Sequence, residues 1–395
     1  MPHQPRTGAW LVGARGSVAT TTILGAAALR AGLVGPAGLV TELPELALAG
    51  LVPVDDLVFG GHDPSPSSLL KRAENLVAGG VVPAQLVASL HDDLVTVDRE
   101  VRPGVGASPA GRPDRSVLDE LAGDIGEFRD RHRLDRVVVV NVASTEAPVQ
   151  ERAEHRSWAE LSRALDAGSR DLLPASSHYA VAAIETGCAY ADFTPSPGGR
   201  LPAVQQLAYE RGIPYAGSDA KTGETLVKSV LAPMFAMRAL RVRSWAGMNL
   251  LGGGDGATLA DAEVAQSKLA SKSQALTAVL GGAVTAPMHI DYVPDLGDWK
   301  TAWDHISFEG FLGVPMTLQF TWQGCDSALA APLVLDLVRL LARAHEAGKF
   351  GALEELSFFF KDPVGTDEHR LSAQWEALCR LAADFSEPAP VSEAG

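Results

Sequence analysis

The chain has 395 residues, of which 46% are hydrophobic and 21% charged, and its formal net charge at pH 7 is −15. This is the balance of an ordinary globular protein, and the length predicts about two domains. The acidic balance argues against a nucleic-acid partner, because phosphate backbones are repelled at long range. We also expect no membrane partner, because no segment offers the ~18 uncharged apolar residues of a membrane helix.

The first predicted unit is a strand followed by a helix. Residues 8–13, GAWLVG, predict a buried strand, and residues 13–22 turn from it into an alanine-rich helix that reaches about Ala31. A strand, a G-x-x-G-S-x-A turn and a helix form a dinucleotide-binding arrangement, although a plain strand–helix junction explains the same pattern. If it is a cofactor site, contacts are expected from Gly13, Arg15, Gly16, Ser17 and Val18.

Two later segments allow two interpretations each. The segment FGGHD either places Asp63 near the adenosine ribose or forms a polar turn before a helix that starts near Ser67. The segment NVASTE ends the β-branched strand 136–142, at the edge where open α/β sheets bind ligands. Ser144 and Thr145 therefore either contact the cofactor or cap a following helix.

The remaining elements predict a doubly wound α/β domain and a second unit. The uniformly apolar strand 136–142, a helix over 201–211 and a short strand over 213–217 alternate as in a parallel sheet with both faces covered. Residues 101–113 are rich in proline and glycine and predict an exposed loop. A helix over 226–240, strand-like alternation in PMTLQFTW and a helix over 328–344 suggest a second domain with its own antiparallel sheet.

A lysine pair is the sharpest functional signal. In QSKLASKSQ, Lys268 and Lys272 lie four residues apart on one predicted helical face, between a glycine-rich stretch at 247–256 and Lys300. Cations gathered near a glycine loop in an acidic chain indicate a local anion site. A solvated helix face is the alternative, although two lysines at this spacing repel mildly. Cys188, Cys325 and Cys379 match no zinc or disulfide spacing and predict a cytoplasmic location, and the sequence leaves a metal requirement open.

Several separated segments resemble the myo-inositol-phosphate synthase family, from about residue 8 to residue 378. They include FGGHD, RVVVVNVASTE, SDAKTGET, NLLGGGDG, SKLASKS, GDWK and CDSALAAP. The resemblance implies a Rossmann-type NAD-binding domain from residues 1–225 plus 325–395. It also implies an inserted α/β catalytic and oligomerisation domain at 226–324, and a homotetramer.

The resemblance further implies a redox-neutral cyclisation of a hexose phosphate. The C5 hydroxyl is oxidised by hydride transfer to NAD⁺, the C6 enolate attacks the sugar's own carbonyl, and the hydride then returns. Such steps need bases and cations where protons leave and oxyanions develop. In the family pattern Lys268 is the acid/base or oxyanion stabiliser, Lys272 holds the phosphate, and Lys300 binds phosphate or reacting oxygens. The other implied positions are Asp219 and Asp326 for orientation, Thr222, Gly223, Glu224 and Asn249 for substrate or phosphate, Asp255 for the cofactor, and Lys221 with an open role.

The chain departs from the family pattern at positions expected near the substrate. Leu250 replaces a histidine, and Glu224 replaces a glutamine, so that we expect Glu224 to point away from phosphate or to meet a lysine. A glycine pair, 253–254, replaces two asparagines. Ala373 stands where the family's last catalytic lysine aligns, and His369, Arg370 or Lys361 are candidates to supply the missing charge.

Together these departures suggest a paralogue of the family with an altered substrate, and they leave several functions open. The family substrate is glucose 6-phosphate, which gives inositol 1-phosphate (3-phosphate in the other numbering). A ketohexose phosphate such as fructose 6-phosphate would give a five-membered carbocycle by the same steps. A simple NAD-dependent dehydrogenase and a non-catalytic NAD or sugar-phosphate sensor are the alternatives of another class.

Overall fold

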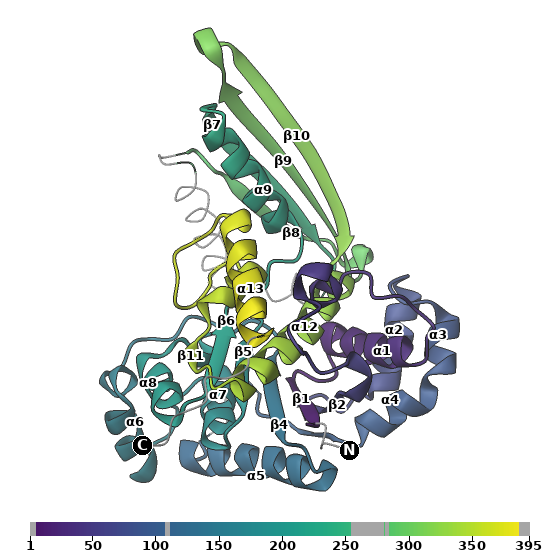
Figure 1. Cartoon of the computed structure of the whole chain (residues 1–395), viewed down its shortest axis with the longest axis vertical. Coiled ribbons are helices and arrows are strands. Elements are labelled where there is room, and N and C mark those ends of the chain that lie inside the picture. The colour runs from purple at the N-terminus through teal and green to yellow at the C-terminus, as the bar shows by residue number, and fades with distance from the viewer. Residues whose placement is uncertain (1–4, 107–110, 254–279, 281–283, 387–395) are drawn as a thin grey trace.

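The computed structural model describes residues 5–106, 111–253, 280 and 284–386 (Figure 1). The predicted helix at 266–274, with Lys268 and Lys272, lies outside the described residues, as do Gly254 and Asp255. Among the helices that are described, none is long and apolar enough to cross a membrane.

A seven-stranded parallel sheet forms the larger unit, with strand order β11-β6-β5-β4-β1-β2-β3. The order reverses direction between β1 and β4, which is the crevice where doubly wound sheets bind dinucleotides. The predicted Rossmann-type fold is therefore confirmed. The strands are β1 (Thr7–Val12), β2 (Val58–Asp63), β3 (Val101–Pro103), β4 (Arg136–Asn141), β5 (Ala189–Asp192), β6 (Pro214–Gly217) and β11 (Gly351–Ala352).

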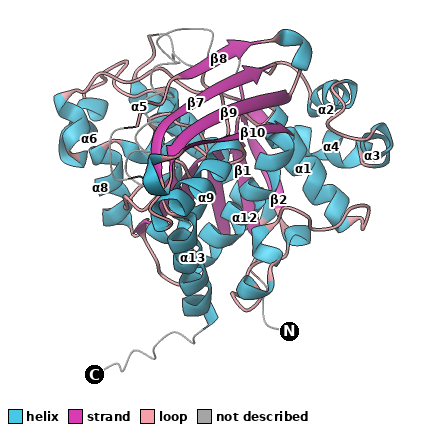
Figure 2. Ribbon diagram, turned by 90° about the horizontal axis from the view of Figure 1, so that it is seen from above, coloured by secondary structure: helices cyan, strands magenta, loops and turns pink. Residues whose placement is uncertain are grey.

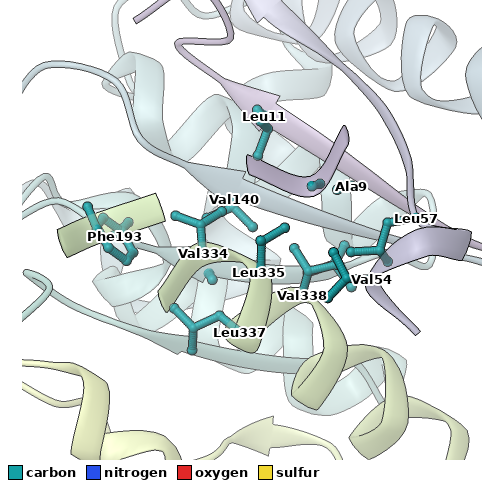
Figure 3. Packing of buried hydrophobic residues seen from close by; sticks show 14 of the residues in the cluster. Ala9, Leu11, Val54, Leu57, Val140, Phe193, Val334, Leu335, Leu337 and Val338 are labelled. Atoms are coloured by element: carbon teal, nitrogen blue, oxygen red, sulfur yellow. The ribbon is translucent and has the colours of Figure 1, made fainter. Parts of the chain in front are cut away.

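Helices cover both faces of this sheet, which explains the unbroken apolar run in β4. Val138 and Val140 pack with α1 and α12, whereas Val137 and Val139 pack with α5 and α7 on the other face. Figure 3 shows Leu335 and other α12 side chains gathered with those of β1 and β4. Each fully buried Val or Leu contributes about 1.5–3 kcal/mol. The helices are α1 (Ser17–Arg30), α2 (Leu69–Ala78), α3 (Ala84–Ser89), α4 (His91–Asp98), α5 (Asp114–His132), α6 (Trp158–Asp166), α7 (Ala175–Glu185), α8 (Pro202–Arg211), α9 (Glu224–Met237), α12 (Asp326–Glu346) and α13 (Leu371–Ser386).

A separate four-stranded sheet has the order β10-β9-β7-β8 (Figure 2). Its strands are β7 (Arg241–Leu251), β8 (Met288–Tyr292), β9 (Trp299–Glu309) and β10 (Pro315–Cys325). The prediction of an antiparallel sheet is wrong for one pair, because β8 runs parallel to β7. Helix α9 covers one face, where Phe235 packs with Trp245 and Ile306. The β9–β10 hairpin projects away from the parallel sheet (Figure 1).

The two units meet through short connections. Strand β10 ends at Cys325 and α12 begins at the next residue, so the second sheet leads directly onto the face of the first. The Ser17 hydroxyl donates to Asp298 at 3.0 Å, and the Trp299 indole donates to the Gly79 carbonyl at 2.9 Å. The predicted boundaries near residues 225 and 325 stay a prediction. The prediction of a loop over residues 101–113 is partly wrong, because this segment starts with the edge strand β3.

Candidate functional site

A cleft opens between the two units, at the carboxyl edge of the parallel sheet. The cleft is open to solvent, and about 870 Å³ of space lies within it and at its mouth. Its lining combines the first sheet, the start of α9 and the second sheet. The lining residues are Val18, Val142, Ala143, Thr145, Phe193, Thr194, Pro195, Asp219, Ala220, Thr222, Gly223, Glu224, Thr225, Asn249, Leu251, Ile290, Lys300, Asp326, Ala330 and Lys361.

The turn after β1 is shaped by backbone contacts that require glycine. Gly13 has φ +83°, and a Cβ there would lie 2.8 Å from the Ala143 Cα, so a side chain is excluded. The amides of Gly13 and Ala14 both donate to the His62 carbonyl, at 2.9 and 3.1 Å. A Cβ at Gly16 would lie 3.1 Å from the Gly13 carbonyl oxygen. The amides of the turn are therefore held within the protein, and cofactor contacts by Gly13, Gly16 and Ser17 stay a prediction.

Helix α1 starts directly after this turn and presents its first amides to the cleft. Its N-cap is Gly16, and no side chain caps it, so the first-turn N–H groups are available to an anion. Val18 lines the cleft. Arg15 was predicted as a cofactor contact, but its guanidinium is held by Asp98 at 2.9 Å and by the Ser65 carbonyl at 2.9 Å.

Asp63 lies at the end of β2 and holds the dinucleotide turn in place. Its two carboxylate oxygens accept the amides of Arg15 at 2.8 Å and Ser65 at 2.7 Å. The alternative of a polar turn before a helix that starts near Ser67 agrees with this contact to Ser65, since α2 starts at Leu69 with Ser68 as its cap. A ribose contact by Asp63 stays a prediction, since each carboxylate oxygen can accept a second hydrogen bond.

Thr145 lines the cleft, whereas Ser144 is exposed beside it. The alternative that these residues cap a helix is wrong, because the next helical turn begins at Ala153. Behind this wall, Asp192 at the end of β5 is 2% exposed and accepts from the Asn141 amide at 3.0 Å. Burial raises the pKa of Asp192 to about 8.

The start of α9 forms the opposite end of the cleft. Thr222, Gly223, Glu224 and Thr225 line it, and the N-cap Gly223 has no side-chain capping bond. A Cβ at Gly223 would lie 2.9 Å from the Trp322 indole nitrogen, so the glycine permits the close approach of β10. The helix dipole favours an anion at this end of the cleft.

Two ion pairs stand in the cleft wall. Lys361 donates to Asp219 at 2.7 Å, and Lys300 lies 3.4 Å from Asp326. The Thr222 hydroxyl also donates to Asp326 at 3.4 Å. These contacts join residues predicted as separate members of the site, because Asp219 follows β6 and Asp326 begins α12.

Lys361 reaches the cleft through backbone pairing. The Lys361 amide donates to the Asp219 carbonyl at 2.7 Å, and the Lys221 amide donates to the Phe359 carbonyl at 2.8 Å. Ala373 does not line the cleft and lies on α13. Of the three candidates for the missing charge, Lys361 lines the cleft and His369 and Arg370 do not. Lys361 is therefore the candidate that lies at the cleft, and its replacement of the family's lysine stays a prediction.

Glu224 is turned toward a buried lysine, as one of the sequence expectations allowed. It accepts from Lys228, one helical turn further along α9, and Lys228 also lies 3.1 Å from Asp304 on β9. The Trp245 indole donates to the same Asp304 oxygen at 2.7 Å. Sequence reasoning missed Lys228 and Asp304, although the Glu–Lys spacing of four was a usable signal.

Other predicted positions lie outside the cleft wall. Leu250 points to the face of β7 opposite Asn249, because side chains alternate along a strand. Lys221 is buried behind the wall and donates to Gln374 on α13 at 2.5 Å. Burial lowers the pKa of Lys221 to about 7. Gly253 is also absent from the lining.

Two hydrogen-bond acceptors in the cleft lining are left unsatisfied by the described residues. Asp219 Oδ2 and Asn249 Oδ1 are buried and have no hydrogen-bond partner among the described residues. Such acceptors favour a ligand that carries donors, for example hydroxyl groups. The lining holds two lysines and three carboxylates in the described ranges, so a bound anion needs the helix amides and further cations.

Comparisons with known proteins agree on one family. The sequence model described as myo-inositol-1-phosphate synthase matches residues 7–382. Inositol-3-phosphate synthase 1 of Bacteroides thetaiotaomicron is 32% identical over 413 aligned positions, covering 95% of both chains. The Drosophila melanogaster inositol-3-phosphate synthase is also 32% identical, and the match covers 75% of this chain and 56% of the longer fly protein.

Solved structures give the same fold. The inositol-3-phosphate synthase of Caenorhabditis elegans superimposes with a TM-score of 0.86 at 22% identity, over 98% of this chain and 87% of that one. A myo-inositol-1-phosphate synthase-related protein from Thermotoga maritima gives a TM-score of 0.77 at 24% identity, over 96% and 99%. At these identities the structures are informative about the fold.

Proposed function

The chain belongs to the myo-inositol-1-phosphate synthase family, and from this premise we propose that it is an NAD-dependent, redox-neutral sugar-phosphate cyclase acting on glucose 6-phosphate. The observation that carries the proposal is that one cleft joins the first turns of two helices. Helix α1, which follows the turn after β1, lines one end through Val18, and the start of α9, which has no side-chain cap, lies at the other.

The residues present fit the NAD cofactor. Gly13 excludes a side chain from the turn, the first amides of α1 are uncapped, and the strand order reverses beside them. NAD, when bound, supplies an acceptor for a hydride from the sugar and a donor for its return. Val142, Ala143 and Thr145 line the neighbouring part of the cleft, where we propose that the nicotinamide ring binds.

The charged pairs suit the proton transfers of the reaction. Lys361 and Lys300 donate hydrogen bonds to substrate oxygens that become negative during the reaction. Asp219 and Asp326 orient these two ammonium groups. The uncapped amides at the start of α9 receive the phosphate. From the family pattern we assign acid/base chemistry to Lys268 and a phosphate contact to Lys272.

The cleft wall favours the family's own substrate. Of the positions that depart from the family pattern, Glu224 is the one that lines the described cleft, and its charge is answered by Lys228. Leu250, Gly253 and Ala373 lie elsewhere. The departures therefore give little reason for a change of substrate, and glucose 6-phosphate is favoured over a ketohexose phosphate.

The proposal is tested by product analysis. The purified protein is incubated with NAD⁺ and either glucose 6-phosphate or fructose 6-phosphate, and the ring size of each product is read by NMR. We expect a six-membered carbocycle from glucose 6-phosphate and no accumulation of NADH at 340 nm. A five-membered ring from fructose 6-phosphate would identify the ketohexose alternative, steady NADH formation would indicate a dehydrogenase, and no product from either sugar would contradict cyclisation.

We infer a homotetramer that uses the outer face of the second sheet. This face lies opposite α9, and Met248 and Trp303 pair across β7 and β9 there, each 40% exposed. At the hairpin tip, Phe311 and Leu312 are 89% and 84% exposed. Contiguous exposed apolar side chains are typical of interfaces. We expect Trp303→Glu to lower the mass measured by light scattering, and an unchanged mass would exclude this face. A cytoplasmic location stays a prediction.

A further inference from the structure

One side chain of the loop between β6 and α9 turns away from the cleft. We call residues 218–223 the cleft loop. Every residue from Asp219 to Thr225 lines the cleft except Lys221. Lys221 is 5% exposed, and its Nζ donates to the side-chain oxygen of Gln374, which is 1% exposed on α13. The contact therefore ties the cleft loop to a helix that contributes no residue to the described lining.

The cleft loop needs such a tie, because its backbone is strained at Asp219. The φ of Asp219 is +60°, in the left-handed region that residues other than glycine adopt only where surrounding contacts impose it. The Asp219 amide donates to the Thr194 carbonyl at 3.1 Å, and its carbonyl accepts the Lys361 amide at 2.7 Å. The side chain of Lys221, two residues further on, adds a tie to a third element of the fold.

The acceptor of this bond is itself held close to the segment that carries Lys361. The side-chain amide of Gln374 donates to the Glu368 carbonyl at 2.6 Å. The next residue, Trp375, packs on Phe358, with ring centroids 5.5 Å apart. Phe358 lies three residues before Lys361. Helix α13 therefore supports the cleft loop and the Lys361 segment at the same time.

The tie works as a hydrogen bond rather than as an ion pair. Gln374 is neutral, and burial lowers the pKa of Lys221 to about 7, so that the amine is mostly uncharged at pH 8. Loss of one partner would leave the other as a buried polar group without its hydrogen bond, which destabilises the fold. Replacement of both partners by apolar side chains can be nearly neutral for stability.

We propose that Lys221 is a positioning residue, whose hydrogen bond to α13 fixes the Asp219–Lys361 ion pair for the reaction. The inference rests on the proposed function, because that function places the Lys361 ammonium group at a reacting oxygen. Lys361 donates to Asp219 at 2.7 Å, so a displaced cleft loop displaces the ammonium group as well. A donor that has moved stabilises the transition state less, and the loss therefore appears mainly in kcat.

The first test removes the donor of the tie. In Lys221→Met at pH 8 we expect kcat for glucose 6-phosphate, counted per bound NAD, to fall about tenfold or more, and by a larger factor than KM rises. The Kd for NAD should change less than about twofold, because the turn after β1 is distant from the change. An unchanged kcat per bound NAD would show that Lys221 only supports folding, and a change mainly in KM would show a role in binding. Either result would overturn the proposal.

The second test replaces both partners, which also serves where a single variant does not fold. Lys221→Met combined with Gln374→Leu sets two apolar side chains against each other. If the two residues act through their contact, the double variant should lose about as much kcat as either single variant, or about tenfold relative to the wild type. A wild-type kcat in the double variant would show that the hydrogen bond is not needed. Single losses that multiply would show two separate roles, and both results contradict the proposal.

A matched control uses a second lysine that contacts α13. Lys349 donates to Asp384 at 3.0 Å, near the other end of the helix and at the surface. Lys349→Met should keep kcat within about twofold of the wild-type value, because it leaves the cleft loop tied. A loss equal to that of Lys221→Met would show that any loosened contact to α13 lowers turnover, and the specific role of Lys221 would be wrong.

Hydrogen exchange reports on the cleft loop without any substrate. Followed by mass spectrometry, the amides of residues 218–223 should exchange faster in Lys221→Met and at the wild-type rate in Lys349→Met. Unchanged exchange in Lys221→Met would refute the tie. If the wild-type protein does not cyclise glucose 6-phosphate, the proposed function fails, and the exchange rates still decide whether Lys221 holds the loop. If the wild type is active and Lys221→Met keeps its kcat, the role of Lys221 fails alone.

Discussion

The part of the cleft wall that follows β1 is shaped by backbone and is called the backbone wall, whereas the part that runs from Asp219 through α9 to the second sheet is built on ion pairs and is called the charged wall. At the backbone wall, Gly13 keeps a side chain out of the turn before α1. In or directly behind the charged wall, Lys361, Lys300 and Lys228 each meet a carboxylate. A site built from backbone is sensitive to replacement of its glycines and tolerates most other side-chain changes. A site built from buried ion pairs is sensitive to the loss of either charged side chain.

The largest effect is expected from Lys268, which the family pattern places at the reacting oxygens. Lys268→Ala should reduce turnover of glucose 6-phosphate by at least about 100-fold, because a transition-state donor is lost. The Kd for NAD, measured by fluorescence titration, should be unchanged, because the dinucleotide turn is not altered. Unchanged turnover would remove Lys268 from the mechanism.

Lys361→Met should lower kcat by about 100-fold, since it removes a cation from the cleft and leaves Asp219 buried without its partner. Steady-state kinetics with glucose 6-phosphate measures the loss. Arg370→Met is the matched control, because the Arg370 guanidinium is exposed and bonds to Glu368 outside the cleft. Equal losses in both variants would show that position 361 has no special role.

Gly13→Ala tests the backbone wall. The positive φ and the 2.8 Å approach to Ala143 make a methyl group strained there, so the Kd for NAD should rise about tenfold or more. Gly25→Ala, within α1 and with no atom within 4 Å of the new Cβ, should instead stabilise the protein by up to about 1 kcal/mol. If both variants bind NAD like the wild type, the turn is not shaped by this contact.

The smallest expected effect is on the free energy of unfolding and comes from Asp192, which is buried behind the backbone wall. Because the pKa of Asp192 is raised to about 8 in the folded protein, its protonated form stabilises the fold at low pH. That stabilisation is lost as pH rises toward and through 8. Between pH 6 and 8 the free energy of unfolding of the wild type should fall by about 2 kcal/mol relative to Asp192→Asn, measured in urea. Parallel pH profiles would contradict the raised pKa.

The backbone wall was largely predictable from the sequence, because strand, turn and glycine are consecutive there. β1, α1 and β4 match their expected ranges within a few residues. The second sheet was less predictable, because alternating apolar residues indicate a strand but not the direction in which it pairs. Strand β8 is parallel to β7, which the sequence did not indicate. The sequence offered Lys361 as one of three candidates for the charge missing at position 373 but could not select it, because its partner Asp219 is 142 residues away in the chain. Asp304 was missed for a similar reason, because only strand register brings it to Lys228.

The backbone pairing of residues 219–221 with 359–361 has a consequence for synthesis of the chain. The ends of β1, β4, β5 and β6 are made within the first 217 residues, but α12, which covers one face of β1 and β4, is made only at residues 326–346. Lys361 and its supporting segment emerge later still, near the end of translation. A prematurely terminated chain therefore lacks the Lys361 ammonium group and, if it stops before residue 326, also the helix that covers the sheet.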